Sequence, residues 1–146
     1  MMNRIERPLV LAAAIGIGFA LGSLVGIFRD VRAQGEPRIF ELRTYTTPEG
    51  KLPNLNARFR DHTMRIFEKH GMTNVGYWTP QDAPASENTL VYILAHRDRD
   101  AAAASWQAFR DDPEWKKVSE ESQVDGRIVA KVESMFLNAA DYSPLK

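Results

Sequence analysis

The chain has 146 residues, a formal net charge of +0 and no cysteine. This length allows one domain with an N-terminal addition, and hydrophobic and charged contents of 44% and 26% are ordinary for a globular protein. The missing net charge argues against nucleic acid as a partner. The missing cysteine excludes a disulfide framework, a thiol nucleophile and thiolate metal sites.

The first 33 residues contain an uncharged apolar run from Pro8 to Phe28. At about 1.5 Å per residue, a helix of this length crosses the hydrocarbon core of a bilayer. Two interpretations remain: an uncleaved membrane anchor, or a signal peptide cut before Gln34. The length of the run favours the anchor. Either one predicts contact with a membrane through residues 8–28 and a domain that is membrane-anchored or exported, hence extracytoplasmic in a bacterium.

After a linker at 34–37, the stretch 38–45 alternates strictly between two sets of side chains, which is typical of a β-strand. The other elements are expected as a helix at 52–70, strands at 73–79 and 88–96, a helix at 101–109 restarting at 113–122, a strand at 127–137 and a tail at 138–146. This order predicts an α+β fold of the ferredoxin-like βαββαβ type, with both helices on one face of an antiparallel sheet. The domain is therefore placed at 38–137.

Local signals place the helix ends. Gly71 is expected to end the first helix in left-handed conformation. Asp100 and Asp112 are expected to cap the later helices. His62 falls at helical spacing with the apolar residues of the first helix, so it is predicted to be a hydrogen-bonded core residue.

Two helices cover only one face of such a sheet, yet apolar side chains alternate onto both. The residues expected under the helices are Phe40, Leu42, Val91, Ile93, Ile128, Val132 and Phe136. Those expected on the open face are Ile39, Tyr45, Tyr92, Val129 and Met135. An exposed apolar face marks an interface. The sequence therefore predicts a homodimer in which a second copy covers the open face, sheet against sheet.

Several short motifs, in their order and spacing, resemble the NIPSNAP family over about residues 38–136. They are Glu41–Tyr45, Gly50-Lys51, the helix end at Phe67–Gly71 and Pro113–Trp115. The resemblance implies a dimeric α+β barrel and no established chemistry. Relatives in animals resemble mitochondrial proteins linked to vesicle traffic and organelle turnover, mostly through protein contacts.

The open face is the predicted place for a ligand. Its candidate pocket residues are Glu41, Arg43, Tyr45, Trp78, Tyr92, His96, Lys131 and Glu133. One strand register would set Arg43 opposite Glu133, Tyr45 opposite Lys131 and Glu41 opposite Met135. Enclosed between two sheets, these groups would line a small-molecule pocket; alternatively, they satisfy one another as ion pairs in the dimer interface.

Two functions from different classes remain open. The first is a homodimeric binding or scaffold module. The second is a cofactor-independent oxygenase or isomerase with a pocket inside the barrel, for which His96 is the best catalytic candidate. The three histidines show no metal-ligand spacing, and no glycine-rich phosphate loop follows a strand, so neither a metal nor a cofactor is predicted. The sequence identifies no ligand or substrate.

Overall fold

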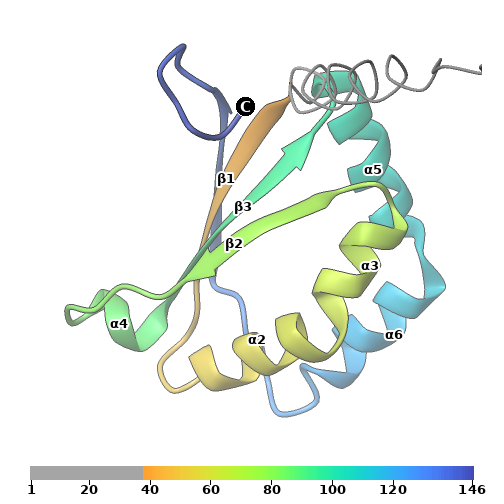
Figure 1. Ribbon diagram of the computed structural model, residues 1–146. Coiled ribbons are helices and arrows are strands. Elements are labelled where there is room, and N and C mark those ends of the chain that lie inside the picture. The colour runs from red at the N-terminus through yellow and green to blue at the C-terminus, as the bar shows by residue number, and fades with distance from the viewer. Residues whose placement is uncertain (1–37) are drawn as a thin grey trace, which may run out of the picture. The chain divides into compact units, whose positions relative to one another are not determined.

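The computed structural model describes residues 38–146, which form a four-stranded antiparallel sheet in the order β2-β3-β1-β4. The strands are β1 (Ile39–Thr46), β2 (Thr73–Trp78), β3 (Thr89–His96) and β4 (Lys131–Asn138). The long helices all lie on one side of this sheet (Figure 1). The predicted βαββαβ fold is confirmed, with β1 and β3 in the centre.

The predicted membrane segment at 8–28 and the linker at 34–37 lie outside the described residues. Within residues 38–146, no helix is both long enough and apolar enough to cross a membrane.

The first helical region is continuous from Leu52 to Lys69, as the sequence predicts, but it contains a π-helix. Its three parts are α2 (Leu52–Arg58), the π-helix η1 (Phe59–Thr63) and α3 (Met64–Lys69). A π-helix inserts one extra residue and so shifts the helix phase. Thr63 is therefore buried while His62 is exposed, and the predicted core position of His62 is wrong.

The end of α3 follows the prediction. Gly71 has φ +77, its N–H bonds to Glu68 O, and the N–H of Met72 bonds to Phe67 O, each at 3.0 Å. This is the double hydrogen bond of a Schellman motif. Met72 packs back into the core and is buried.

Three further helices follow: α4 (Ala85–Asn88), a short helix in the β2–β3 connection, and α5 (Arg99–Asp111) and α6 (Pro113–Glu121), which complete the helix layer (Figure 1). Asp112 caps α6 as predicted, accepting from Glu114 N at 2.8 Å. Asp98, and not Asp100, caps α5: its side chain accepts from Ala101 N at 2.7 Å. The helix begins at Arg99, two residues earlier than predicted, because Asp98 has the extended backbone that an N-cap requires.

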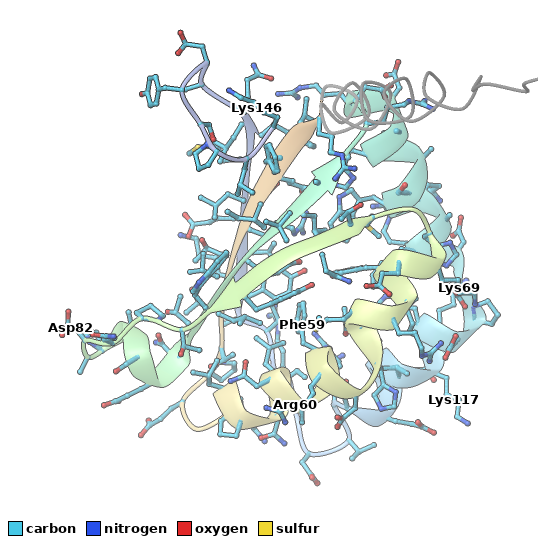
Figure 2. All side chains as sticks on the ribbon, in the orientation of Figure 1. Phe59, Arg60, Lys69, Asp82, Lys117 and Lys146 are labelled. Atoms are coloured by element: carbon cyan, nitrogen blue, oxygen red, sulfur yellow. The ribbon has the colours of Figure 1, made fainter. Side chains whose placement is uncertain are left out.

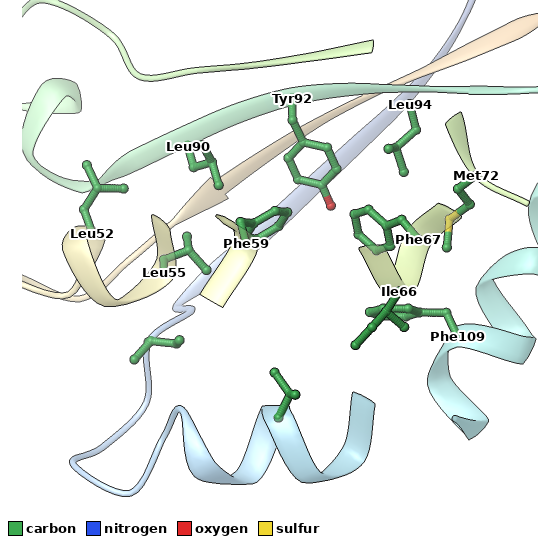
Figure 3. Close-up of a cluster of buried hydrophobic side chains, with 12 residues drawn as sticks. Leu52, Leu55, Phe59, Ile66, Phe67, Met72, Leu90, Tyr92, Leu94 and Phe109 are labelled. Atoms are coloured by element: carbon green, nitrogen blue, oxygen red, sulfur yellow. The ribbon is translucent and has the colours of Figure 1, made fainter. Parts of the chain in front are cut away.

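The core lies between the sheet and the helices (Figure 3). Tyr92 at its centre is fully buried and stacks on Tyr77 at a ring-centroid distance of 5.2 Å. Phe59 and Phe67 of the first helical region pack against Tyr92 at 5.1 and 6.1 Å. This aromatic cluster fixes the first helical region on β3.

The two faces of β1 and β3 are reversed relative to the prediction. Glu41 is buried and bonds to Trp106 of α5, so Glu41, Arg43 and Tyr45 point toward the helices, with Ile39 on the same side. Alternation shows which residues share a face, but not which face meets the helices. The residues expected under the helices in β1 and β3 lie on the open face instead; these are Phe40, Leu42, Val91 and Ile93.

The pairing of β1 with β4 is offset by one residue from the predicted register. Arg43 lies opposite Ser134, Tyr45 opposite Val132 and Glu41 opposite Phe136. The predicted faces of β4 are therefore correct although those of β1 are not. Val129, expected on the open face, is half-buried and packs against the core beside the buried Ile128.

Candidate functional site

The structure divides the eight predicted pocket residues between the two sides of the sheet. The helix side holds Glu41, Arg43, Tyr45, Tyr92 and His96, whereas the open face holds Trp78, Lys131 and Glu133. A single pocket containing all eight does not exist. Two separate groups of side chains remain, and each has its own chemistry.

A buried carboxylate organises the helix side. Glu41 is 2% exposed, and its two oxygens accept hydrogen bonds from four side chains. The donors are His96 Nε2 at 3.0 Å, Trp106 Nε1 at 2.7 Å, Arg43 Nη1 at 2.7 Å and Ser134 Oγ at 2.7 Å. Because these donors come from β3, α5, β1 and β4, Glu41 connects both neighbouring strands to the helix layer.

This environment keeps Glu41 ionised. Burial alone would raise its pKa, but the hydrogen bonds from His96, Trp106, Ser134 and Arg43 outweigh burial and lower the pKa to about 2. A carboxylate of such low pKa is a poor general base near neutral pH. Its lone pairs are also already committed to protein donors.

Arg43 is the charge partner of Glu41. Its guanidinium carbon lies 4.2 Å from the centroid of the Trp106 ring, a cation–π arrangement. Burial would lower the pKa of Arg43, but Tyr45, Tyr92 and Glu41 together raise it. Arg43 and Glu41 therefore form an ion pair, and both members contact the indole of Trp106.

His96 is buried with Glu41. Its Nε2 atom is bound to the carboxylate, and its Nδ1 atom is buried without a hydrogen-bond partner in the described part of the chain. The structure therefore places His96, the catalytic candidate, against a carboxylate whose hydrogen-bond acceptors are already occupied. There the imidazole holds Glu41 in position. Phe136 lies beside it, at a ring-centroid distance of 6.3 Å.

The open face is apolar in its centre and charged at one edge. Trp78 and Met135 are 52% and 59% exposed on it. A hollow of about 480 Å³ lies over Leu42, Thr44 and Met135. Lys131 and Glu133 pair along β4 at 2.9 Å.

The C-terminal tail borders the other end of this face. Residues 139–145 lie next to Phe40, Ile93 and Leu137 and enclose with them a mostly apolar hollow of about 380 Å³. In Figure 1 the tail forms a loop beyond the end of β4, away from the helices.

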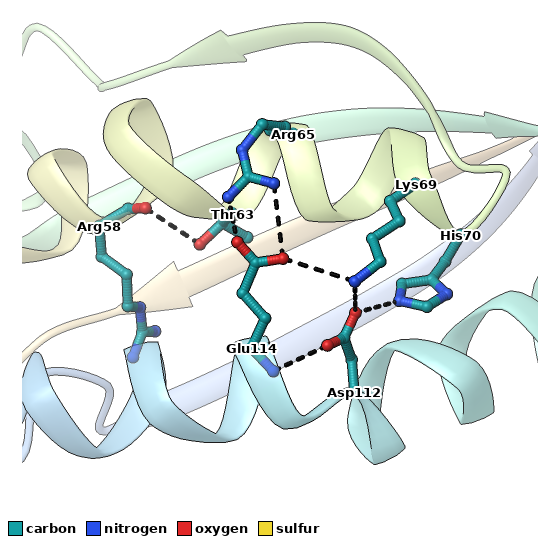
Figure 4. Close-up of polar contacts among 7 residues, drawn as sticks. All are labelled: Arg58, Thr63, Arg65, Lys69, His70, Asp112 and Glu114. Atoms are coloured by element: carbon teal, nitrogen blue, oxygen red, sulfur yellow. Dashed lines mark hydrogen bonds and ion pairs between the residues drawn. The ribbon is translucent and has the colours of Figure 1, made fainter.

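A second polar cluster joins α3 to α6 (Figure 4). Asp112 accepts from His70 Nε2 at 2.6 Å and pairs with Lys69 Nζ at 2.7 Å. Glu114 pairs with Lys69 at 3.4 Å and with Arg65. Hydrogen bonds from Lys69 and then His70 hold the pKa of Asp112 well below its usual range.

Sequence reasoning missed three residues that the geometry brings forward: Trp106, Ser134 and Arg58. Trp106 belongs to no sequence motif that points to Glu41, yet an indole N–H that is partly buried needs an acceptor, and Glu41 supplies it. Ser134 lies opposite Arg43 only in the observed register, which is offset by one residue from the predicted one. Arg58 carries no motif, and only its burial in the folded chain marks it.

The fold and these sites define a ferredoxin-like α+β domain with one helix-covered and one open sheet face. The family model for NIPSNAP matches residues 40–144, and the chain belongs to the NIPSNAP family. No curated relative matches the chain.

Solved structures of bacterial NIPSNAP proteins are similar to this chain. A NIPSNAP family protein of unknown function from Agrobacterium tumefaciens strain C58 is 25% identical, with a TM-score of 0.66, and the match covers 77% of this chain and 96% of that one. An uncharacterised NIPSNAP domain protein from Burkholderia xenovorans is 25% identical, with a TM-score of 0.62, covering 73% and 98%. A second A. tumefaciens family protein is 22% identical, with a TM-score of 0.65, covering 75% and 99%. These three solved chains therefore consist almost wholly of the matched domain.

Proposed function

We propose that this NIPSNAP domain is a homodimeric binding or scaffold module whose two copies meet through their open sheet faces. The observation that carries the proposal is the exposure of large apolar side chains on the open face, where Trp78 on β2 and Met135 on β4 are more than half exposed at its two edges. Large exposed apolar patches in single domains are typical of interaction surfaces.

A second copy fits this face better than an unrelated partner. A two-fold axis turns each surface toward an identical one. The edge carries one cation and one anion, Lys131 and Glu133, so each can meet the opposite charge of the other copy. The hollow over Leu42 and Met135 would then be enclosed inside the barrel.

The geometry gives less support to the oxygenase or isomerase alternative. Glu41 and His96 lie on the helix side of the sheet, outside any barrel interior formed by the open faces. The Glu41 carboxylate is occupied by four donors, and His96 is buried beside it. These groups are arranged to hold the fold together.

Light scattering on residues 35–146 tests the dimer. The wild-type domain is expected to have the mass of two chains at micromolar concentration. Met135→Lys places a charge in the open face and should shift the mass to one chain. Val124→Lys is the matched control, because Val124 is 80% exposed and lies after α6, away from the open face. A monomeric wild type, or equal effects of both variants, contradicts the proposal.

We further propose that the apolar run at 8–28 holds this module at a membrane or directs its export. Support comes from the length and lack of charge of the run. Alkaline extraction of membranes from cells making the full chain separates the two forms. An intact chain in the membrane pellet indicates an anchor, a chain beginning near Gln34 in the soluble fraction indicates a cleaved signal, and an intact soluble chain contradicts both.

A further inference from the structure

The helix layer contains a buried arginine, Arg58, that has no carboxylate partner within residues 38–146. Arg58 is 6% exposed. Among residues 38–146, its guanidinium makes one long hydrogen bond, from Nη1 to Ser122 Oγ at 3.4 Å, and its buried Nε has no partner. The Trp115 ring lies 5.2 Å from its Cζ atom. A guanidinium offers five N–H donors, so most of this capacity is unused.

The contrast with Arg43 shows that this arrangement is costly. Arg58 is buried and the Arg43 side chain is 16% exposed, and both lie near Tyr45 and Tyr92, but of the two only Arg43 is paired with an acid within the described residues. Burial lowers the pKa of Arg58, and the two tyrosines offset this only in part. An unpaired buried charge is retained at the expense of stability, so an external counter-ion is the natural complement.

Arg58 lines a cleft between the first helical region and α6. The cleft has a volume of about 300 Å³, at the lower end of the range for small-molecule sites. Its other polar lining includes Asn54, His62 and Ser122. Figure 4 shows the Arg58 side chain extending from α2 toward α6, into the space between these elements.

The π-helix η1 begins directly after Arg58 and shapes this cleft. Thr63 Oγ1 donates to Arg58 O at 3.2 Å, which closes the widened turn. The extra residue turns His62 out of the core and into the cleft lining. Short π-helices of this kind are frequent at functional sites.

The charges of the lining restrict the ligand. Arg58 is a buried cation, whereas Asp61, Glu121 and Asp125 are exposed acids that also line the cleft. Glu121 has a distant partner in Lys117 at 3.8 Å. Three carboxylates repel a multiply charged anion such as phosphate. They attract an ammonium group, provided that a carboxylate at its other end can reach Arg58.

We propose that this cleft binds a small zwitterion, with its carboxylate on the Arg58 guanidinium and its ammonium group among Asp61, Glu121 and Asp125. Amino acids and short amino carboxylates belong to this class. The cleft lies in the helix layer and uses no residue of the open face. The proposal therefore does not depend on the dimer.

The test follows the Nε–H resonance of Arg58 by NMR in residues 35–146 while four probes are titrated: 4-aminobutyrate, butyrate, n-butylamine and inorganic phosphate. We expect 4-aminobutyrate to shift this resonance and to bind more tightly than the other three probes. Tighter binding of phosphate, of butyrate or of n-butylamine overturns the proposed ligand class. The absence of any shift overturns the site.

Arg58→Met removes the proposed contact and should weaken 4-aminobutyrate binding, measured by calorimetry, at least about tenfold, since hydrogen bonds to charged groups are strong. Arg60→Met is the matched control. It removes the same charge two residues away, where the side chain is exposed (Figure 2), and should leave the affinity unchanged. Equal affinities of the wild type and Arg58→Met contradict the proposal.

Three further variants cover the remaining outcomes. If Arg58→Met does not fold, Arg58→Lys keeps the charge but loses the forked donors, and it should still weaken binding. If Asp61 or Glu121 turns inward as the counter-ion of Arg58, Asp61→Asn or Glu121→Gln will shift the Arg58 resonance without any probe. That result would also overturn the proposal.

Discussion

The indole Nε1 of Trp106 donates to Oε2 of Glu41 at 2.7 Å, across 65 residues of sequence. This bond joins α5 to the central strand β1, where Glu41 points from the sheet into the helix–sheet interface. The centre of the helix–sheet interface is therefore polar, and its free energy depends on every donor to Glu41 being in place.

The first prediction concerns the charge of Glu41. Glu41→Gln keeps the shape but places an amide NH₂ among four donors and leaves Arg43 without its anion. Breaking a buried ion pair in this way should lower the free energy of unfolding by about 3 kcal/mol. Urea denaturation of residues 35–146 measures this. Glu49→Gln, in the turn after β1 where the side chain is exposed, should change stability by less than about 0.5 kcal/mol. Similar losses for both variants would contradict a special role for Glu41.

The second prediction is the pH dependence that follows. The pKa of Glu41 is lowered from 4.5 to about 2 in the folded state. A group whose pKa is depressed by folding stabilises the protein above its unfolded pKa, and this stabilisation is lost as the pH falls through the folded pKa. Wild-type stability should therefore decline between pH 4.5 and about 2. Thermal unfolding of Glu41→Gln across the same range should show a shallower decline, and parallel curves would disprove the assignment.

Much of the fold can be predicted from the sequence because it depends on residues that are close together in the chain. The alternation of 38–45, the Gly71 stop and the Asp112-Pro113 start each depend on neighbouring residues only. The element order then leaves one common topology. The order and spacing of the family motifs predict the same topology.

The sequence could not predict which face of the central strands meets the helices, and the reason is physical. Hydrophobicity alone favours turning Phe40 and Leu42 toward the helices and Glu41 away from them. The opposite orientation is stable because three side chains from distant parts of the chain, those of His96, Trp106 and Ser134, donate hydrogen bonds to the Glu41 carboxylate. A one-residue change in register reverses every side chain, so no local pattern could decide it.

The candidate site was only half predictable for the same reason. The prediction that His96 and Glu41 share one face of the sheet is correct, but that face is the helix side and not the open face. The Arg58 cleft depends on the π-helix, which shifts His62 out of the apolar stripe that its spacing predicts. A helical wheel assumes 3.6 residues per turn and cannot anticipate one inserted residue.

The third prediction tests the helix stop at Gly71. Its φ of +77 suits glycine, and a Cβ there would strain the backbone although the nearest atom, Ser105 Oγ, is 3.7 Å away. Gly71→Ala should therefore lower the free energy of unfolding by about 1 kcal/mol. Gly71→Asn should cost less, because asparagine tolerates the left-handed region. An equal loss in the two variants would point to crowding by Ser105 and not to backbone conformation.

The fourth prediction concerns the joint between α3 and α6. Asp112 caps α6 and also binds His70 and Lys69, so Asp112→Ala removes the cap and both cross-helix contacts. The melting temperature should fall by about 5 °C or more. Asp111→Ala is the neighbouring control, since Asp111 is exposed and accepts a hydrogen bond from Gln107 of its own helix. Hydrogen bonds from Lys69 and His70 hold the pKa of Asp112 low, so the difference between Asp112→Ala and the wild type should shrink as acid protonates this carboxylate. A difference that stays constant down to the lowest pH at which the domain folds would show that Asp112 acts through its shape and not its charge.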